Sequence, residues 1–446
     1  MISESEKMKA SAIYPQDDGT SRIDRNVALL NYHWENVNFG AVLTAYALNR
    51  AVNSLGYSAR NIDYVPDFFW VAKESPNPRF DEFRKRHLPM TRRIRAGEDL
   101  RFLNGQFAHF VVGSDQVWRP EFMREETEAF LLGFAAPNKN ILSYAASFGT
   151  DELALDPDER EEWRLRLRRF DHVTVREVSG VALCAGLGIA ARQVADPVFL
   201  LRRADWEALA SEHAPNEQHG ADDIVCYTID PTLKDAIEDF VRMHADAFGT
   251  SRVLDISWNT SVPEWLWQMS HARFIVTDSF HASCFALIFG RPFVCVNPHV
   301  KTQTRMESLF ASFGVGGRLL SSFADVSPAA LAVEASDDET SRLSLALEQA
   351  RAASLAILRE MLDGPGKPID EKEGAERDLR VRLCASLRDF LRASRLDCLR
   401  YRLLSRLFPG RRGMKYATKY KTLKDRRKKA ARRLRRLDAV SREGGC

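Results

Sequence analysis

Residues 273–296, RFIVTDSFHASCFALIFGRPFVCV, contain a complete β-α-β unit. The apolar run Phe274–Thr277 predicts a strand, and after a short polar turn the apolar residues recur at helical spacing over about residues 281–289. Gly290 ends that helix, and Phe293–Val296 predicts the next strand. Units of this kind build a mostly parallel sheet with helices on its faces.

Apolar runs earlier in the chain alternate with helical patterns in the same way, so we expect an α/β fold with two Rossmann-like domains. The other expected strands are Asn26–Leu30, Asn61–Val65, His109–Val112, Ile141–Tyr144, His172–Val175, Ile224–Ile229 and Val253–Ile256. The other expected helices include residues 42–55, 158–170, 233–248 and 263–272. No repeat of fixed period is visible, which argues against solenoids and propellers.

The changes of pattern divide the chain into five parts. They are a disordered N-terminus (1–22), an N-terminal Rossmann-like domain (23–195), a C-terminal Rossmann-like domain (196–325), a helical connection (326–372) and a basic amphipathic tail (373–446). The Gly and Pro residues between Asp363 and Pro368 separate the body from the tail.

The composition is that of a folded globular protein, with 45% apolar and 28% charged residues. The start of the chain lacks the apolar segment of a secretion signal, and no stretch reaches the roughly 18 apolar residues that a membrane span needs. The seven cysteines lack the spacing of a zinc site. We therefore expect a cytoplasmic protein with reduced thiols and no metal.

The positive charge of the chain is concentrated at its end. Residues 377–446 hold 24 Lys and Arg against 6 Asp and Glu, whereas the whole chain has a formal net charge of only +3. Leucines between Leu379 and Leu407 recur near helical spacing with arginines between them, which suits the surface of an anionic membrane. A solvated charge run is an equal alternative. A nucleic acid or protein partner is a weaker one, because no nucleic-acid-binding motif accompanies the basic residues.

The polar turn Asp278–His281 lies where a parallel strand enters a helix, at the edge of the sheet where open α/β folds bind ligands. Ser279 suits the N-cap position and His281 the first helical turn, where free N–H groups favour a phosphate or carboxylate. His281 would then act as a general acid or base. In the alternative interpretation, Ser279 only caps the helix and His281 only packs. We expect a structural role for Asp278.

Two other strand ends carry polar residues. Asp115 and Gln116 follow the strand that ends FVV, either as ligand contacts or as a simple turn. Arg176 follows His172–Val175, where it would clamp a carboxylate or phosphate or pair with Glu177.

Weaker candidates lie elsewhere. Arg305 and Arg318 are further cations of the second domain. The turn into the first helix contains Asn38 and Gly40 but lacks GxGxxG, so it supports no dinucleotide site.

Six segments, in this order along the chain, resemble the polysaccharide pyruvyl transferase family. They are NFGAVLTAYAL (38–48), VVGSDQVW (111–118), LSYAASFG (142–149), VTVRE (173–177), ADPVFLL (195–201) and VTDSFHASCFALIFGRPFV (276–294). The resemblance covers about residues 27–320. It implies a GT-B-like arrangement of the two domains, phosphoenolpyruvate as co-substrate without a further cofactor, and a sugar acceptor that receives a pyruvate ketal.

The resemblance also implies roles for individual residues. The family's SFH histidine maps onto His281 and its arginine onto Arg176, the two catalytic candidates. Ser279, Phe280 and Arg305 are then donor-site candidates in the second domain. The first domain supplies the acceptor-site candidates, which are Asn38, Gly40, Asp115 and Gln116.

One departure from the family pattern is the longer turn Tyr32–Val37 before NFG, which would reshape the acceptor site. Two other functions stay open at this point. One is a GT-B-type glycosyltransferase that uses a nucleotide sugar. The other is a non-catalytic glycan-binding scaffold held at the inner face of the cytoplasmic membrane by residues 377–436.

Overall fold

The computed structural model describes residues 24–34, 38–66, 78–123, 126–213, 223–250, 252–256, 259–297, 303–333, 336–407 and 411–443. The expected disorder of residues 1–22 and the end of the longer turn, residues 35–37, lie outside these ranges.

A parallel six-stranded sheet forms the core of the first half of the chain, in the order β2-β1-β5-β6-β7-β8. Its strands are β1 (Asn26–Leu30), β2 (Ser58–Asn61), β5 (His109–Val112), β6 (Asn140–Ala146), β7 (His172–Val175) and β8 (Arg192–Gln193). The strand order reverses between β1 and β5, and the carboxyl ends of strands at such a reversal are where open α/β folds bind ligands.

A second parallel sheet has five strands in the order β10-β9-β11-β12-β13. Its strands are β9 (Ile224–Tyr227), β10 (Val253–Asp255), β11 (Phe274–Thr277), β12 (Phe293–Val296) and β13 (Leu319–Leu320). Here the order reverses between β9 and β11, so the turn Asp278–His281 follows a strand at the reversal. Both sheets therefore have the doubly wound order that the alternating pattern predicted.

The prediction of a strand at Asn61–Val65 is wrong. The edge strand β2 is Ser58–Asn61, whose residues are alternately exposed and buried, and its polar sequence SARN gives no apolar signal. The apolar residues that suggested a strand lie beyond it. Tyr64–Val65 (β3) pairs instead with Ile94–Arg95 (β4) in a separate two-stranded sheet.

The helices of the body are α2 (Phe39–Ser54), α3 (Pro78–His87), α4 (Pro120–Met123), α5 (Thr127–Phe130), α6 (Pro157–Leu167), α7 (Val178–Gly186), α8 (Arg203–Ala210), α9 (Lys234–Met243), α10 (Ala245–Phe248), α11 (Val262–His271), α12 (Phe280–Phe289) and α13 (Gln303–Ser312). The expected single helix 233–248 is broken at His244, whose backbone leaves the helical region. The break turns Phe248 into the core, where its ring lies 4.5 Å from that of Phe274.

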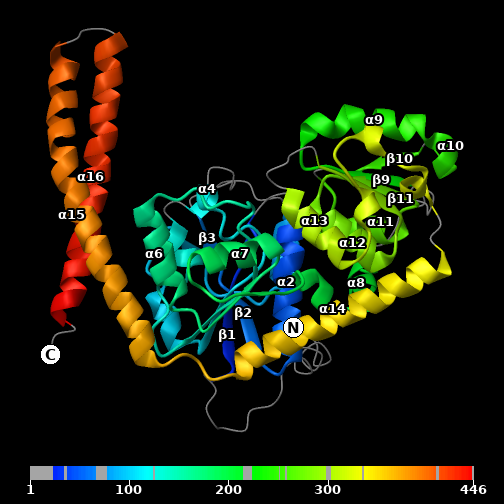
Figure 1. Ribbon diagram of the computed structural model, residues 1–446, viewed down its shortest axis with the longest axis horizontal. Coiled ribbons are helices and arrows are strands. Elements are labelled where there is room, and N and C mark those ends of the chain that lie inside the picture. Colours follow the sequence, from blue (N-terminus) through cyan, green and yellow to red (C-terminus); the bar gives the residue numbers. More distant parts are fainter. Residues whose placement is uncertain are drawn as a thin grey trace, which may run out of the picture.

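Two helices connect the sheets (Figure 1). Helix α2 follows β1, yet its apolar face packs with residues of α11 and α12 from the second half of the chain. Helix α14 (Asp337–Asp363) runs along both domains, with Leu343 and Leu347 against the second core and Leu358 and Met361 in the core beneath the first sheet. Two Rossmann-like domains thus lie side by side, and the predicted GT-B-like fold with a helical C-terminal region is confirmed.

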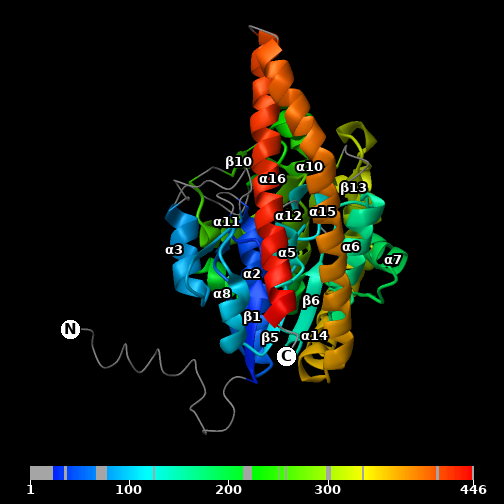
Figure 2. The same ribbon diagram turned by 90° about the vertical axis from the view of Figure 1, so that its left-hand side faces the viewer.

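The basic tail forms two long helices, α15 (Ile369–Leu407) and α16 (Arg411–Glu443), which pack against each other as an antiparallel hairpin. Figures 1 and 2 show the hairpin standing beside α6 and extending past the globular body. The expected helical tail is therefore present, but part of its apolar face is covered by the partner helix. Within the described ranges, no helix is long and apolar enough to cross a bilayer.

Candidate active site

The turn after β11 carries His281 into the first turn of α12. Ser279 is the N-cap of this helix and accepts a hydrogen bond from the Ala282 N–H at 3.4 Å. Thr277 holds the turn, because its hydroxyl donates to the Tyr227 carbonyl and accepts from the Ser279 N–H. His281 is fixed on a rigid strand-to-helix junction and is almost fully buried.

The imidazole of His281 contacts the first domain directly. Its Nε2 lies 3.0 Å from Thr44 Oγ1 of α2 and 3.5 Å from Asp196 Oδ2. Gly40, one turn before Thr44, lies against the ring near Nδ1, and any side chain at residue 40 would overlap the ring. Among the described residues, Nδ1 has no hydrogen-bond partner.

Asp196 is the centre of the cluster. Its Oδ2 accepts hydrogen bonds from Ser114 Oγ at 2.8 Å and Arg176 Nη1 at 3.0 Å, and its Oδ1 accepts the Val198 N–H at 3.1 Å. Burial alone would raise the pKa of the Asp196 carboxyl, but the contact with His281 and the charge of Arg176 hold this pKa well below its usual range. Asp196 is therefore an anion that orients both catalytic candidates.

Arg176 is buried at the end of β7 and stacks over Phe280, with its guanidinium carbon 4.1 Å from the ring centroid. Burial would lower the pKa of Arg176, but the charges of Asp196, Glu177 and Asp115 raise it above its usual value. Its Nε lies 3.6 Å from Glu177 Oε2, so the expected alternative pairing with Glu177 is present. Within the described part of the chain, neither Nε nor Nη2 makes a hydrogen bond, and no ion-pair contact is found for Nη2. A buried cation with unused donors is costly unless an anion completes it, so these atoms favour anion binding.

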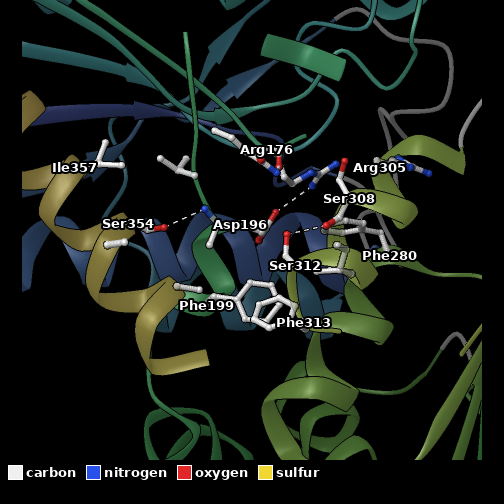
Figure 3. Close-up of a pocket in the computed structure, with 16 residues that line it drawn as sticks. Arg176, Asp196, Phe199, Phe280, Arg305, Ser308, Ser312, Phe313, Ser354 and Ile357 are labelled. Carbon is white, nitrogen blue, oxygen red and sulfur yellow. Dashed lines mark hydrogen bonds and ion pairs between the residues drawn. The ribbon is translucent and has the colours of Figure 1, made fainter. Parts of the chain in front are cut away.

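A cavity of about 180 Å³ opens beside these residues (Figure 3). Arg176, Asp196 and Phe280 line one part of it, and residues of α13 and α14 close the other. Figure 3 shows Arg305 of α13 on the same side of the cavity as Arg176. Burial and the neighbouring charge of Arg176 lower the pKa of Arg305 to about 10, so Arg305 is still a cation at neutral pH. It forms no ion pair with any residue that the structure describes.

The donor-site candidates and Arg176 thus lie near His281. The four acceptor-site candidates each have a different structural role. Asn38 is the N-cap of α2 and accepts the Ala41 N–H. Gly40 provides room for the His281 ring. Asp115 has a left-handed backbone with φ of 80°, a strained conformation that is typical of functional sites, and its charge acts on Arg176. Gln116 accepts a hydrogen bond from Arg119.

Arg318 and Asp278 lie apart from this cluster. Arg318 pairs with Glu339 and lines a separate cavity of about 630 Å³ beneath α14. The Asp278 carboxylate accepts the backbone N–H groups of Ile229 and Asp230 and so bridges the reversal between β9 and β11. Asp278 therefore has the structural role expected of it.

Thr44 and Asp196 contact His281 but were not predicted as site residues, and Ser114 was predicted only as part of the polar turn after β5. Thr44 could have been found from its spacing. It lies four residues after the candidate Gly40, and residues four apart share one face of a helix. Asn31 is another polar residue that was not predicted. It is buried after β1 and lies against Gly113, and both polar atoms of its side chain lack hydrogen-bond partners among the described residues. No group of His, Cys, Asp and Glu in the described residues has the makeup of a metal site.

Comparison with known protein families identifies the family to which the sequence is similar. A family model described as polysaccharide pyruvyl transferase matches residues 38–300, more than half of the 446 residues. A search of curated protein sequences finds no match.

Solved structures with a similar fold are only distantly alike. They include UDP-GlcNAc 2-epimerases from Neisseria meningitidis (11% identity, TM-score 0.45, covering 76% of this chain and 100% of that one) and Methanocaldococcus jannaschii (10%, 0.44, 76% and 99%). An O-GlcNAc transferase from Thermobaculum terrenum has 12% identity and a TM-score of 0.39, covering 82% of this chain and 71% of that one. At these values the likeness carries no functional argument.

Proposed function

The chain belongs to the polysaccharide pyruvyl transferase family, and on that premise we propose that it transfers pyruvate from phosphoenolpyruvate to a sugar, forming a pyruvate ketal. The sugar would belong to a cell-surface polysaccharide or to its lipid-linked precursor. The observation that carries the proposal is Arg176, a buried cation with N–H groups that make no hydrogen bond, which lines a cavity with Arg305 and shares the partner Asp196 with His281.

The charges around the cavity suit phosphoenolpyruvate, which carries a carboxylate and a phosphate. Asp196 already neutralises Arg176, so Arg176 offers hydrogen bonds rather than net charge. Arg305 supplies the second guanidinium, which forms no ion pair with a described residue, although the charges of Asp115 and Glu177 act on it. The N-terminus of α12 adds free N–H groups next to Ser279, which favour phosphate oxygens.

The reaction requires a proton on the methylene carbon of phosphoenolpyruvate and a stabilised oxocarbenium-like centre at C2. One sugar hydroxyl adds to C2, phosphate leaves, and a second hydroxyl of the same sugar closes the ketal. The first hydroxyl proton balances the new C–H bond, and the second leaves with phosphate. The His281 imidazole is the proposed general acid and base, a role worth about 10²–10⁴ in rate.

We propose that the acceptor binds on the side of the first domain, near Asp115 and Gln116. These residues follow β5 at the reversal of the first sheet, and the charge of Asp115 acts on Arg176. We also propose that the enzyme works at the inner face of the cytoplasmic membrane, where the basic residues 377–436 would meet anionic lipids.

The test is incubation with phosphoenolpyruvate and a panel of aryl and lipid-linked glycosides, read by mass spectrometry for added pyruvate and by release of inorganic phosphate. His281→Ala should fold normally and lower transfer at least about a hundredfold. Release of nucleoside diphosphate from a nucleotide sugar, with phosphoenolpyruvate inert, would instead identify a glycosyltransferase. Binding of glycans without turnover of either donor would identify a scaffold.

A further inference from the structure

The far end of the hairpin combines positive charge with exposed apolar side chains. We call residues 392–405 of α15 and 414–424 of α16 the hairpin tip. These residues include eight Lys and Arg and a single acidic residue, Asp397. Many such cations in a short segment attract an anionic surface.

Leucines on α15 form an uncovered face within this charge. Leu396, Leu399 and Leu403 are 74%, 57% and 58% exposed, and their spacing of three and four residues places them on one side of the helix. Met414 at the start of α16 is also exposed. Three large apolar residues that are exposed on one helical face form an apolar patch, and such a patch is typical of an interaction surface.

The other side of α15 is already occupied by α16. Arg427 of α16 donates hydrogen bonds to the Leu391 carbonyl and to Ser394 Oγ. Nearer the tip, the rings of Tyr401 and Tyr416 stack. The hairpin therefore holds the leucine face outward without help from any other part of the fold.

The opposite end of the hairpin is fixed to the body. Lys372 is buried and pairs with Asp171, and Arg382 pairs with Asp158 at 2.6 Å. Because α15 has 39 residues, it is about 58 Å long at 1.5 Å per residue. Figures 1 and 2 both show the tip reaching beyond the other described elements, so the leucines can meet a flat surface before the body does.

We propose that the hairpin tip is a membrane anchor, in which Leu396, Leu399 and Leu403 enter the boundary of the acyl chains while the surrounding cations bind anionic headgroups. The inference rests on the proposed membrane location and not on the proposed reaction. A nucleic acid offers no partner for a leucine face. A second copy of the chain would bring two clusters of like charge together, which disfavours pairing through the tip.

The experiment is co-sedimentation of the full-length protein with vesicles, made either of phosphatidylcholine alone or of phosphatidylcholine with phosphatidylglycerol, without any substrate. The wild type should partition at least about tenfold more strongly to the anionic vesicles, and added salt should weaken the binding. The combined variant Leu396→Ser, Leu399→Ser and Leu403→Ser should lose at least about a hundredfold in partitioning, because three leucines no longer enter the bilayer. Leu345→Ser on α14, also 60% exposed but far along the chain from the tip, is the matched control and should bind like the wild type.

Three results would overturn the inference. The triple serine variant binds vesicles as the wild type does; or the wild type shows no preference for anionic lipid; or light scattering shows a dimer that only the triple variant breaks. A parallel assay with RNA in place of vesicles gives a fourth contrary result if the protein binds RNA more tightly than anionic vesicles and the serine changes do not weaken that binding. Since the assay contains no phosphoenolpyruvate, its outcome is independent of the donor test.

Discussion

Gly40 of α2 lies against the imidazole ring of His281 so closely that no side chain fits between them. A β-carbon at residue 40 would stand 2.8 Å from Cε1 of the ring and closer still to Nδ1. The two residues come from different halves of the fold, because α2 follows β1 and α12 follows β11. Thr44, on the same face of α2, contacts Nε2 of that ring. The position of one domain against the other therefore fixes the catalytic candidate.

We expect Gly40→Ala to impair the site although alanine favours a helix. The added methyl must displace His281, and overpacking of this kind costs about 1–3 kcal/mol in the free energy of unfolding. Pyruvyl transfer should fall at least about tenfold, because the displaced imidazole no longer has the position that the proposed reaction needs. Urea unfolding and the transfer assay measure the two effects.

Gly374→Ala in α15 is the matched control for this substitution. A β-carbon at residue 374 would meet only the end of the Arg377 side chain, at 3.8 Å. The change should therefore leave transfer unchanged and stabilise the helix by up to about 1 kcal/mol. Equal behaviour of the two alanine variants would refute the close packing at Gly40.

The second prediction concerns Asp196. Asp196→Asn removes the carboxylate nearest to Arg176 and leaves this buried cation with only the more distant Glu177 as an ion-pair partner. Breaking a buried ion pair in this way should cost about 3 kcal/mol or more in the free energy of unfolding. Transfer should fall with it, because both His281 and Arg176 lose the group that orients them.

Ser114→Ala separates orientation from charge. It removes the hydrogen bond that Ser114 donates to Asp196 and the long one, 3.5 Å, that it accepts from Arg176, but no charge. It should cost about 1 kcal/mol, measured by urea unfolding. If Asp196→Asn were no more destabilising than Ser114→Ala, the carboxylate would not carry the charge that the geometry assigns to it.

Much of the fold follows from the sequence, because its central strands are short apolar runs that end in polar turns. Strands β1, β5, β7, β11 and β12 were predicted with their observed bounds. The edge strand β2 escaped prediction because half of its residues face solvent and carry no apolar signal. The hairpin partner of α15 also escaped, since the sequence of α16 is dominated by charge and its contacts lie far away in the chain.

The residues of the site could likewise be predicted only in part. His281 and Arg176 each stand at the end of a recognisable strand, so local pattern was enough to select them. Their arrangement depends on contacts between distant residues, such as Thr44 with His281, which are 237 positions apart. A sequence shows that Asp196 follows a strand, but only the fold shows that it touches both catalytic candidates.

The third prediction is that Arg305 contributes to donor affinity. Arg305→Gln should weaken the binding of phosphoenolpyruvate about ten- to hundredfold in calorimetry, because hydrogen bonds to a charged group are worth about 1.5–3 kcal/mol. The stability of the folded protein should not fall, because within the described structure this half-buried cation has no ion-pair partner to lose.

Arg318→Gln is the control for this variant, since Arg318 lines the other cavity and pairs with Glu339. It should bind phosphoenolpyruvate like the wild type and lose a little stability. Unchanged donor affinity in Arg305→Gln would remove Arg305 from the donor site.

The fourth prediction concerns pH, through His109 at the start of β5. Burial lowers the pKa of His109 below its usual value of 6.5. The ring is neutral in this setting, because Nδ1 accepts a hydrogen bond from Asn140 Nδ2 and Nε2 donates to the Asp24 carbonyl. The same Asn140 amide donates to the Met361 carbonyl, so protonation of His109 would disturb the docking of α14.

The sign of the effect follows from where the proton binds. Below pH 6.5 the unfolded chain takes up a proton at His109 that the folded chain excludes, so stability is lost as pH falls from about 6.5 towards the folded pKa. The loss is at most about 1.4 kcal/mol per pH unit and does not occur above the unfolded pKa. Urea unfolding at a series of pH values from 8 to about 5 should therefore show a steeper decline in the wild type than in His109→Gln, which cannot take up the proton. Parallel curves would mean that His109 is free to ionise in the folded protein. They would contradict the role of a neutral His109 ring in linking β5 to α14.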